Sequence, residues 1–256
     1  MESRISIDIN ADLGEFSTEK QLANELSILE YITSCSIACG GHVGDANSIK
    51  LMIQACKKYN ISIGPHPSYP DKEGFGRRQI NIDIHDLENS LIEQINLFFN
   101  VADSLSVPVS HIKLHGRLYN ETFKSERLSN LLIRVVESLD REVSIIGPAK
   151  SQIEIVAKAS NKTFISEAFI DRVYKEDLSL VDRRKKGALL LAVEDQVNQA
   201  RSIILNHRVI TDKKKSVGIE AQTLCMHGDN PNSLKTIKAV RQMFTVENIN
   251  LKPYSK

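Results

Sequence analysis

Short apolar runs alternate with longer stretches of helical periodicity along the whole chain, and this alternation constrains the fold more than any other feature. In the stretch 87–105, for example, Leu87, Leu91 and Ile95 fall on one stripe at helical spacing. A strand–helix repeat of this kind builds a parallel sheet covered by helices. The predicted strands span residues 5–9, 36–39, 61–64, 111–114, 143–146, 163–165 and 223–226.

A closed or nearly closed β/α barrel is the fold that we predict from this repeat, and an open doubly wound sheet is the alternative. A chain of 256 residues is long enough for one barrel, because β/α barrels reach this size without splitting into domains. No linker, composition break or low-complexity segment interrupts the repeat. We therefore expect residues 1–256 to form a single domain.

The charge balance excludes two classes of partner. With 33 Lys and Arg against 32 Asp and Glu, the formal charge is +1, whereas nucleic acids and membrane surfaces select a basic face. The sequence contains no apolar run of about eighteen residues and no signal-peptide pattern. We expect a cytoplasmic protein whose four cysteines are reduced and buried, because their spacing fits no zinc-finger pattern.

Several catalytic signatures are absent from the sequence. It lacks the Gly-x-Gly-x-x-Gly dinucleotide fingerprint, the Gly-x-x-x-x-Gly-Lys phosphate loop, the Gly-x-Ser-x-Gly elbow and the His-Glu-x-x-His zinc signature. Serine-nucleophile and zinc-protease mechanisms of these types are therefore excluded. We also expect no tightly bound organic cofactor.

Ionisable residues gather where the predicted strands end. They are His42, His66, His115 and His227, with Asp12 and Glu15 after the first strand, Asp45 after the second, Glu167 and Asp171 after the sixth, and Asp229 after the last. The C-terminal strand ends of β/α barrels carry the chemistry, and burying so many ionisable groups without a function would cost desolvation energy. We therefore predict one shared site at one end of the barrel.

A glycine-rich turn, CGGHVGD at 39–45, leads from the second predicted strand into a helix. Such a turn lets backbone N–H groups and a helix N-terminus approach an anion, although tight turns need glycine for steric reasons alone. On the first interpretation, Gly40, Gly41 and Gly44 contact a phosphate or carboxylate. Lys113 and Arg77 could bind the same kind of anion, or could equally form surface ion pairs.

Seven motifs, in order along the chain, resemble the LamB/YcsF family. They are NADLGE at 10–15, IACGGHVGD at 37–45, IGPHPSYPD at 63–71, GFGRR at 74–78, KLHGRLYN at 113–120, EAFIDR at 167–172 and MHGDNP at 226–231. The resemblance implies a distorted TIM-like barrel of seven or eight mostly parallel strands, related in shape to polysaccharide deacetylases. It also implies a reaction in which 5-oxo-L-proline, ATP and water give L-glutamate, ADP and phosphate, with Mg²⁺ accompanying ATP.

Family members work with two further subunits, B and C, and a homo-oligomer is also compatible with the sequence. Because Asp12 ends the first predicted strand, we expect its side chain to point into the barrel mouth and to orient or deprotonate water, with Glu15 in a less direct role. His66 and His115 would donate protons or stabilise charge on the lactam oxygen, and Lys113 would neutralise the transferred phosphoryl group. The residues expected to contact substrate or ATP are Asn10, Gly40, Gly41, Gly44, Asp45, Arg77, Lys113, Arg172 and Asp229.

Two other functions remain open from the sequence. In the first, the chain is a metal-dependent amidohydrolase or deacetylase that acts without ATP, with Asp12, His42 and His66 as ligands around an open water position. In the second, it is a non-catalytic partner subunit whose site only binds a ligand.

Overall fold

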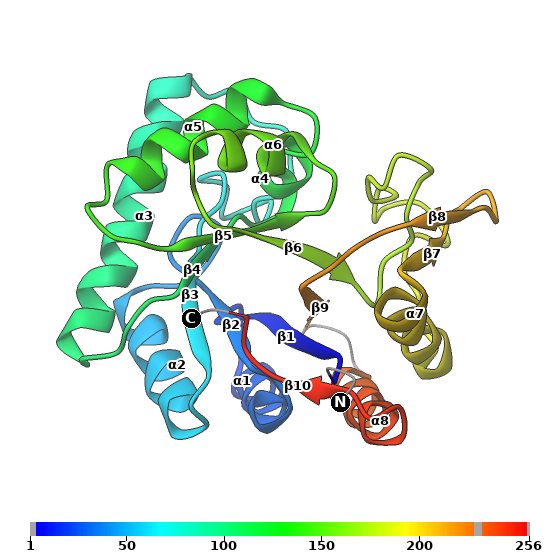
Figure 1. The fold of residues 1–256 in the computed structure, drawn as a ribbon. Coiled ribbons are helices and arrows are strands. Elements are labelled where there is room, and N and C mark those ends of the chain that lie inside the picture. The colour runs from blue at the N-terminus through cyan, green and yellow to red at the C-terminus, as the bar shows by residue number, and fades with distance from the viewer. Residues whose placement is uncertain (1–3, 228–231, 255–256) are drawn as a thin grey trace.

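The computed structural model describes residues 4–227 and 232–254, and its strands form a nearly closed barrel surrounded by helices (Figure 1). Parallel strands follow one another around the barrel in the order β3-β2-β1-β9-β6-β5-β4. They are β1 (Ser6–Leu13), β2 (Ser34–Ala38), β3 (Ser62–His66), β4 (His111–Lys113), β5 (Ser144–Pro148), β6 (Phe164–Phe169) and β9 (Thr223–His227). The predicted barrel is confirmed, and each predicted strand overlaps one of these.

The barrel closes at a seam between β3 and β4. Within the described residues, one isolated parallel bridge joins Ile63 of β3 to Val109, just before β4, and no full ladder forms there. Two backbone hydrogen bonds support the seam: the Ser110 amide donates to the Ile63 carbonyl at 2.9 Å, and the His115 amide donates to the Pro67 carbonyl at 2.8 Å.

Helices cover the outside of the barrel, and several of them begin at a side-chain cap. Thr18, Asp45, Asp83, Ser125 and Ser151 each accept a backbone N–H of the first turn, which satisfies a donor that has no partner within the helix. The helices are α1 (Glu19–Ser27), α2 (Ala46–Lys58), α3 (Ile84–Ser104), α4 (Gly116–Glu121), α5 (Glu126–Glu137), α6 (Gln152–Ala159), α7 (Val193–Asn206) and α8 (Ser233–Val246), with a 3₁₀ turn at Leu29–Tyr31.

Three short strands were not predicted. β7 (Arg208–Ile210) and β8 (Ser216–Gly218) form an antiparallel hairpin beside α7, outside the barrel (Figure 1), and β10 (Asn250–Leu251) pairs with the first residues of β1. Within the described residues, no helix combines the length and the apolar character needed to cross a lipid bilayer.

The apolar core lies between the strands and the helices. Ile9 and Leu13 of β1 belong to one buried cluster with Ile53 of α2 and Val240 of α8. A second cluster joins α3 and α5 to β4 and β5. All four cysteines are buried and unpaired, as predicted. Because the core occupies this outer shell, the lumen of the barrel is left for other side chains.

Candidate active site

Polar side chains line the lumen. Asp8, Asn10 and Asp12 alternate with apolar residues along β1, and they share one face of the strand because successive side chains point to opposite sides. All three are buried, with exposed fractions of 1%, 0% and 7%. The strand register sets Asp12 level with His227 of β9 and Ser36 of β2. The polar face of β1 therefore looks across the lumen.

Two predicted positions need correction. Asp12 and Glu167 do not follow their strands but lie inside them, since β1 continues to Leu13 and β6 continues to Phe169. The physical reason is the polar lumen: an inward-facing carboxylate interrupts the apolar run in the sequence, yet the strand continues through it.

Lys113, the last residue of β4, joins residues from across the barrel. Its Nζ lies 2.8 Å from Asp12 Oδ1, 2.7 Å from Glu167 Oε1, and 3.1 Å from both Asn10 Oδ1 and Cys225 Sγ. The side chain is only 1% exposed. Two carboxylates therefore share one ammonium in the lumen, and Lys113 fixes the positions of both.

Neighbouring charges keep Asp12 and Lys113 ionised despite their burial. Burial alone would raise the pKa of Asp12, but His66 and Lys113 outweigh it and hold that pKa well below its usual range. Burial alone would lower the pKa of Lys113, but Asp12, Cys225 and Glu167 outweigh it and raise that pKa well above its usual range. A carboxylate with a lowered pKa is a weak base, so Asp12 is better suited to orienting a reactant than to accepting a proton from water.

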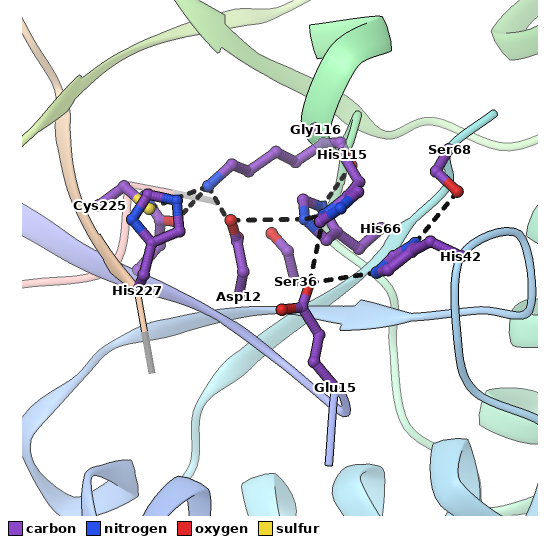
Figure 2. Close-up of polar contacts among 12 residues, drawn as sticks. Asp12, Glu15, Ser36, His42, His66, Ser68, His115, Gly116, Cys225 and His227 are labelled. Carbon is purple, nitrogen blue, oxygen red and sulfur yellow. Dashed lines mark hydrogen bonds and ion pairs between the residues drawn. The ribbon is translucent and has the colours of Figure 1, made fainter. Parts of the chain in front are cut away.

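A histidine cluster adjoins Asp12 (Figure 2). His42 Nε2 and His115 Nδ1 lie 3.1 and 3.2 Å from the same oxygen of Glu15, Oε1. His115 Nδ1 also lies 3.0 Å from His66 Nε2, which in turn lies 3.4 Å from Asp12 Oδ2. The rings of His42 and His115 stack with centroids 3.6 Å apart and planes inclined by 3°. The structure thus brings five of the predicted residues into one connected group.

Burial and the carboxylate of Glu15 shift the pKa values of His42 and His115 in opposite directions. Burial lowers the pKa of His42 and of His115, and Glu15 only partly offsets it. Burial alone would raise the pKa of Glu15, but His115 and His42 hold it well below its usual range. Glu15 is therefore ionised.

A third group forms at the end of β9. His227 Nδ1 lies 2.8 Å from Asp171 Oδ2, and the His227 ring stacks on Phe169 at 5.3 Å between centroids. Burial alone would raise the pKa of Asp171, but His227 outweighs it and lowers that pKa. Arg172 is buried beside this pair and donates to the Val181 carbonyl at 2.8 Å.

A cavity of about 350 Å³ opens over these groups. Asp12, Lys113, His115 and His227 reach its wall, so the buried groups are within reach of a small molecule. Most of the charged side chains around it are cations: Arg77, Lys113, Arg117, Arg172, Lys175, Arg183 and Arg184 line the wall, against Asp12, Glu121 and Asp182. A second cavity, of about 550 Å³, shares Tyr119, Phe169 and Leu180 with the first.

The anion cradle expected at the glycine-rich turn stays a prediction, and the helix that follows the turn has a cap of its own. Asp45, at its end, is exposed and caps α2 by accepting the amides of Asn47 and Ser48, both at 2.9 Å. The first-turn donors are thus occupied by the chain's own carboxylate. Gly40 and Gly44 adopt positive φ values of 106° and 94°, which explains the glycines by turn geometry. None of the turn's residues lines either of the two cavities described above.

One predicted residue, Asp229, lies outside the described residues.

Sequence reasoning missed some residues of the lumen. Asp8 accepts hydroxyl hydrogen bonds from Thr33 at 2.6 Å and Ser34 at 2.7 Å, and burial raises its pKa. His111 is 1% exposed, and burial lowers its pKa to about 3. The alternation of polar and apolar residues in β1 was a signal that could have identified Asp8.

Among the residues that the structure describes, one set of side chains has donor atoms close enough to hold a metal ion. The ligand atoms of Glu15, His42 and His115 all lie within 4.8 Å of one another. The set predicted from the sequence, Asp12, His42 and His66, is different: the stacked rings of His42 and His115 bring these two together at Glu15, while Asp12 is paired with Lys113.

Comparisons with known proteins agree on one family. The model of the LamB/YcsF family matches residues 7–256. Two proteins that carry the name of the A subunit of 5-oxoprolinase, from Staphylococcus aureus strains Newman and COL, are each 31% identical over 245 residues, covering 96% of this chain and 98% of the relative.

Solved structures share the fold at lower identity. A lactam utilization protein from Thermus thermophilus matches with a TM-score of 0.88 at 24% identity, covering 98% of this chain and 100% of that one. The catalytic domain of a peptidoglycan N-acetylglucosamine deacetylase from Eubacterium rectale matches with a TM-score of 0.52 at 12% identity, covering 100% and 91%. The expected likeness to a deacetylase barrel is thereby confirmed for the fold.

Proposed function

This chain belongs to the LamB/YcsF family, and on that premise we propose that it is the A subunit of a cytoplasmic, ATP-dependent 5-oxoprolinase. The relatives that carry this name match it over nearly their whole length. The substrate would be 5-oxo-L-proline, and the product L-glutamate.

One structural observation carries the proposal: buried acid and base groups open into a small cavity whose charged rim is mainly cationic. Its volume of about 350 Å³ lies in the range of small-molecule sites. Arg77, Arg117 and Arg172 on its wall suit a substrate carboxylate and phosphoryl oxygens, because guanidinium groups bind such anions with two parallel hydrogen bonds.

The proposed reaction balances as follows. The lactam oxygen attacks the γ-phosphorus of ATP and ADP leaves, which turns a poor electrophile into a good one. Water adds to the activated carbon, the C–N bond breaks as the nitrogen gains a proton, and an acyl phosphate remains. A second water releases phosphate and leaves the new carboxylate of glutamate.

Particular side chains suit these steps. Asp12 is held ionised by Lys113 at 2.8 Å and would orient the attacking water. His227, on the cavity wall, is the group able to transfer protons there. Subunits B and C would complete the enzyme, and ATP with Mg²⁺ would bind in the assembled complex.

A second candidate function is a metal-dependent amidohydrolase that needs no ATP, favoured by the convergence of Glu15, His42 and His115. Release of glutamate from 5-oxoproline separates the two. We expect release when this chain, B, C, ATP and Mg²⁺ are all present, and none when any one is left out. Release by this chain alone without ATP would support the amidohydrolase, and full activity of B and C without this chain would refute both.

A further inference from the structure

We propose that Glu15, His42 and His115 bind a divalent transition-metal ion, with His66 beside it. The inference rests on how hydrogen atoms are distributed in the cluster, and it does not depend on the substrate or on ATP.

The outward nitrogen of each histidine is committed as a donor. His66 Nδ1 lies 2.8 Å from the Lys113 carbonyl, and His115 Nε2 lies 3.0 Å from the Phe75 carbonyl. A carbonyl oxygen only accepts, so both nitrogens carry hydrogen. These are the backbone contacts that typically orient metal-binding histidines.

His42 follows the same pattern through a hydroxyl. Its Nδ1 lies 3.1 Å from Ser68 Oγ, and that hydroxyl donates its own hydrogen to the Tyr69 carbonyl at 2.8 Å. Ser68 therefore accepts from His42, and Nδ1 of His42 carries the hydrogen. In a neutral imidazole the other nitrogen is then a lone pair, so all three histidines direct lone pairs inward.

These lone pairs face one another and two carboxylates. The inner contacts run from His42 to Glu15 at 3.1 Å, from Glu15 to His115 at 3.2 Å, and from His115 to His66 at 3.0 Å. The last contact joins His66 to Asp12 at 3.4 Å. Acceptors this close repel each other unless positive charge lies between them. Either additional protons or one divalent ion supplies that charge.

Protons are the poorer solution. His42 and His115 stack face to face at 3.6 Å, so protonating both would set two cations against each other at that distance. One ion at the ring edges, beside the ionised Glu15, avoids this. A zinc–nitrogen bond is about 2.0–2.1 Å long. To form two such bonds, the stacked rings would have to rotate about χ2, so that they are no longer parallel.

The donor set indicates which ion binds. Imidazole nitrogens with one carboxylate suit Zn²⁺ and its transition-metal neighbours, whereas Mg²⁺ prefers oxygen ligands. Because His115 also reaches the wall of the 350 Å³ cavity, an ion at this position would lie near a molecule bound there.

Metal binding to the isolated full-length chain tests the proposal without any activity assay. After dialysis against a chelator, Zn²⁺, Co²⁺ and Mg²⁺ are titrated calorimetrically, and bound metal is counted by elemental analysis. We expect one Zn²⁺ per chain, visible-region bands of nitrogen-coordinated Co²⁺, and much weaker Mg²⁺ binding. Ser68→Ala removes the hydroxyl that orients His42 and is expected to weaken Zn²⁺ binding by ~10-fold or more.

Glu15→Gln and His42→Gln should weaken Zn²⁺ binding further than Ser68→Ala does. His85→Gln, at an exposed histidine on α3, is the matched control and should bind normally. Because a ligand variant could misfold, the Tm of each protein is measured with and without Zn²⁺. Less than ~0.1 equivalent of Zn²⁺ or Co²⁺ on the folded wild-type chain, or normal Zn²⁺ binding by folded Glu15→Gln and His42→Gln, would overturn the proposal.

Discussion

Lys113 on β4 and Asp12 on β1 form a buried ion pair across the lumen, with 2.8 Å between Nζ and Oδ1. Their strands are not neighbours in the sheet, so the contact joins opposite sides of the barrel. Glu167 approaches the same ammonium at 2.7 Å, and the stoichiometry is therefore two carboxylates to one cation.

That stoichiometry predicts unequal effects on stability. Lys113→Met leaves two buried carboxylates without a counter-charge and is expected to lower the free energy of unfolding by about 3–5 kcal/mol. Asp12→Asn leaves Lys113 paired with Glu167 and retains an oxygen that can accept a hydrogen bond, so about 1 kcal/mol is expected. Urea denaturation of both variants measures the difference, and equal losses would show that the ammonium does not hold the group together.

The same Asp12→Asn variant tests catalysis. If the negative charge of Asp12 orients the attacking water, glutamate release in the complete complex should fall by ~10²–10⁴-fold. Because Asn is nearly isosteric with Asp, complex formation should be unchanged. Turnover within a few fold of wild type would remove Asp12 from the proposed chemistry.

The cations of the cavity rim should govern substrate affinity. Arg117 lines the cavity and pairs with Glu121 at 2.7 Å, and its side chain is partly accessible to a ligand. Arg117→Gln is expected to raise KM for 5-oxoproline or ATP by ~10-fold, the loss of roughly one charge-assisted hydrogen bond. Arg134→Gln is the control, because Arg134 pairs with Glu88 on the helical surface at 2.6 Å. Identical kinetics for the two variants would contradict this role.

His111 should contribute to acid instability. Burial lowers its pKa from 6.5 to about 3, so below pH 6.5 the unfolded chain takes up a proton that the folded chain refuses until pH 3. Stability is therefore lost as pH falls through this window. In His111→Gln the free energy of unfolding should fall less steeply with decreasing pH, by about 1.4 kcal/mol per pH unit. Parallel stability curves for the two proteins between pH 4 and 6 would show that His111 is not neutral in the fold.

The surroundings of Gly41 leave no room for a methyl group. A Cβ there would overlap the Gln94 amide oxygen and lie 2.5 Å from Ser68 Oγ, and Ser68 contacts His42. Gly41→Ala is expected to lose about 1–3 kcal/mol of stability through overpacking. At Gly218 the nearest atom would be 3.8 Å away, so Gly218→Ala should be close to neutral. Thermal melts of the two variants provide the comparison.

The strands were predictable and their ends were not, for one physical reason. Apolar runs revealed each barrel strand because the outward faces pack against helices. The inward faces are polar, so the predicted strands end early, before Asn10 in β1 and before Ser166 in β6. The β7–β8 hairpin was missed because its residues are largely exposed, which leaves little apolar signal.

The gathering of the histidines followed from topology, whereas their contacts did not. Parallel strands bring their C-terminal ends together, which placed His66 and His115 near each other. The stacking of His42 on His115 depends on side-chain rotamers, which no spacing in the sequence encodes. At the glycine-rich turn, the sequence favours Asp45 as a ligand-binding residue, whereas in the structure its side chain caps α2.

The division between an apolar shell and a polar lumen also bears on how this protein can change over evolution. In the shell, volume and shape limit which substitutions are tolerated. In the lumen, charge and hydrogen bonding set the limit. Lumen positions that share a charge therefore have to change together, since replacing Lys113 alone would leave Asp12 and Glu167 without their cation. Shell positions are free of that constraint and can change one at a time as long as volume is kept.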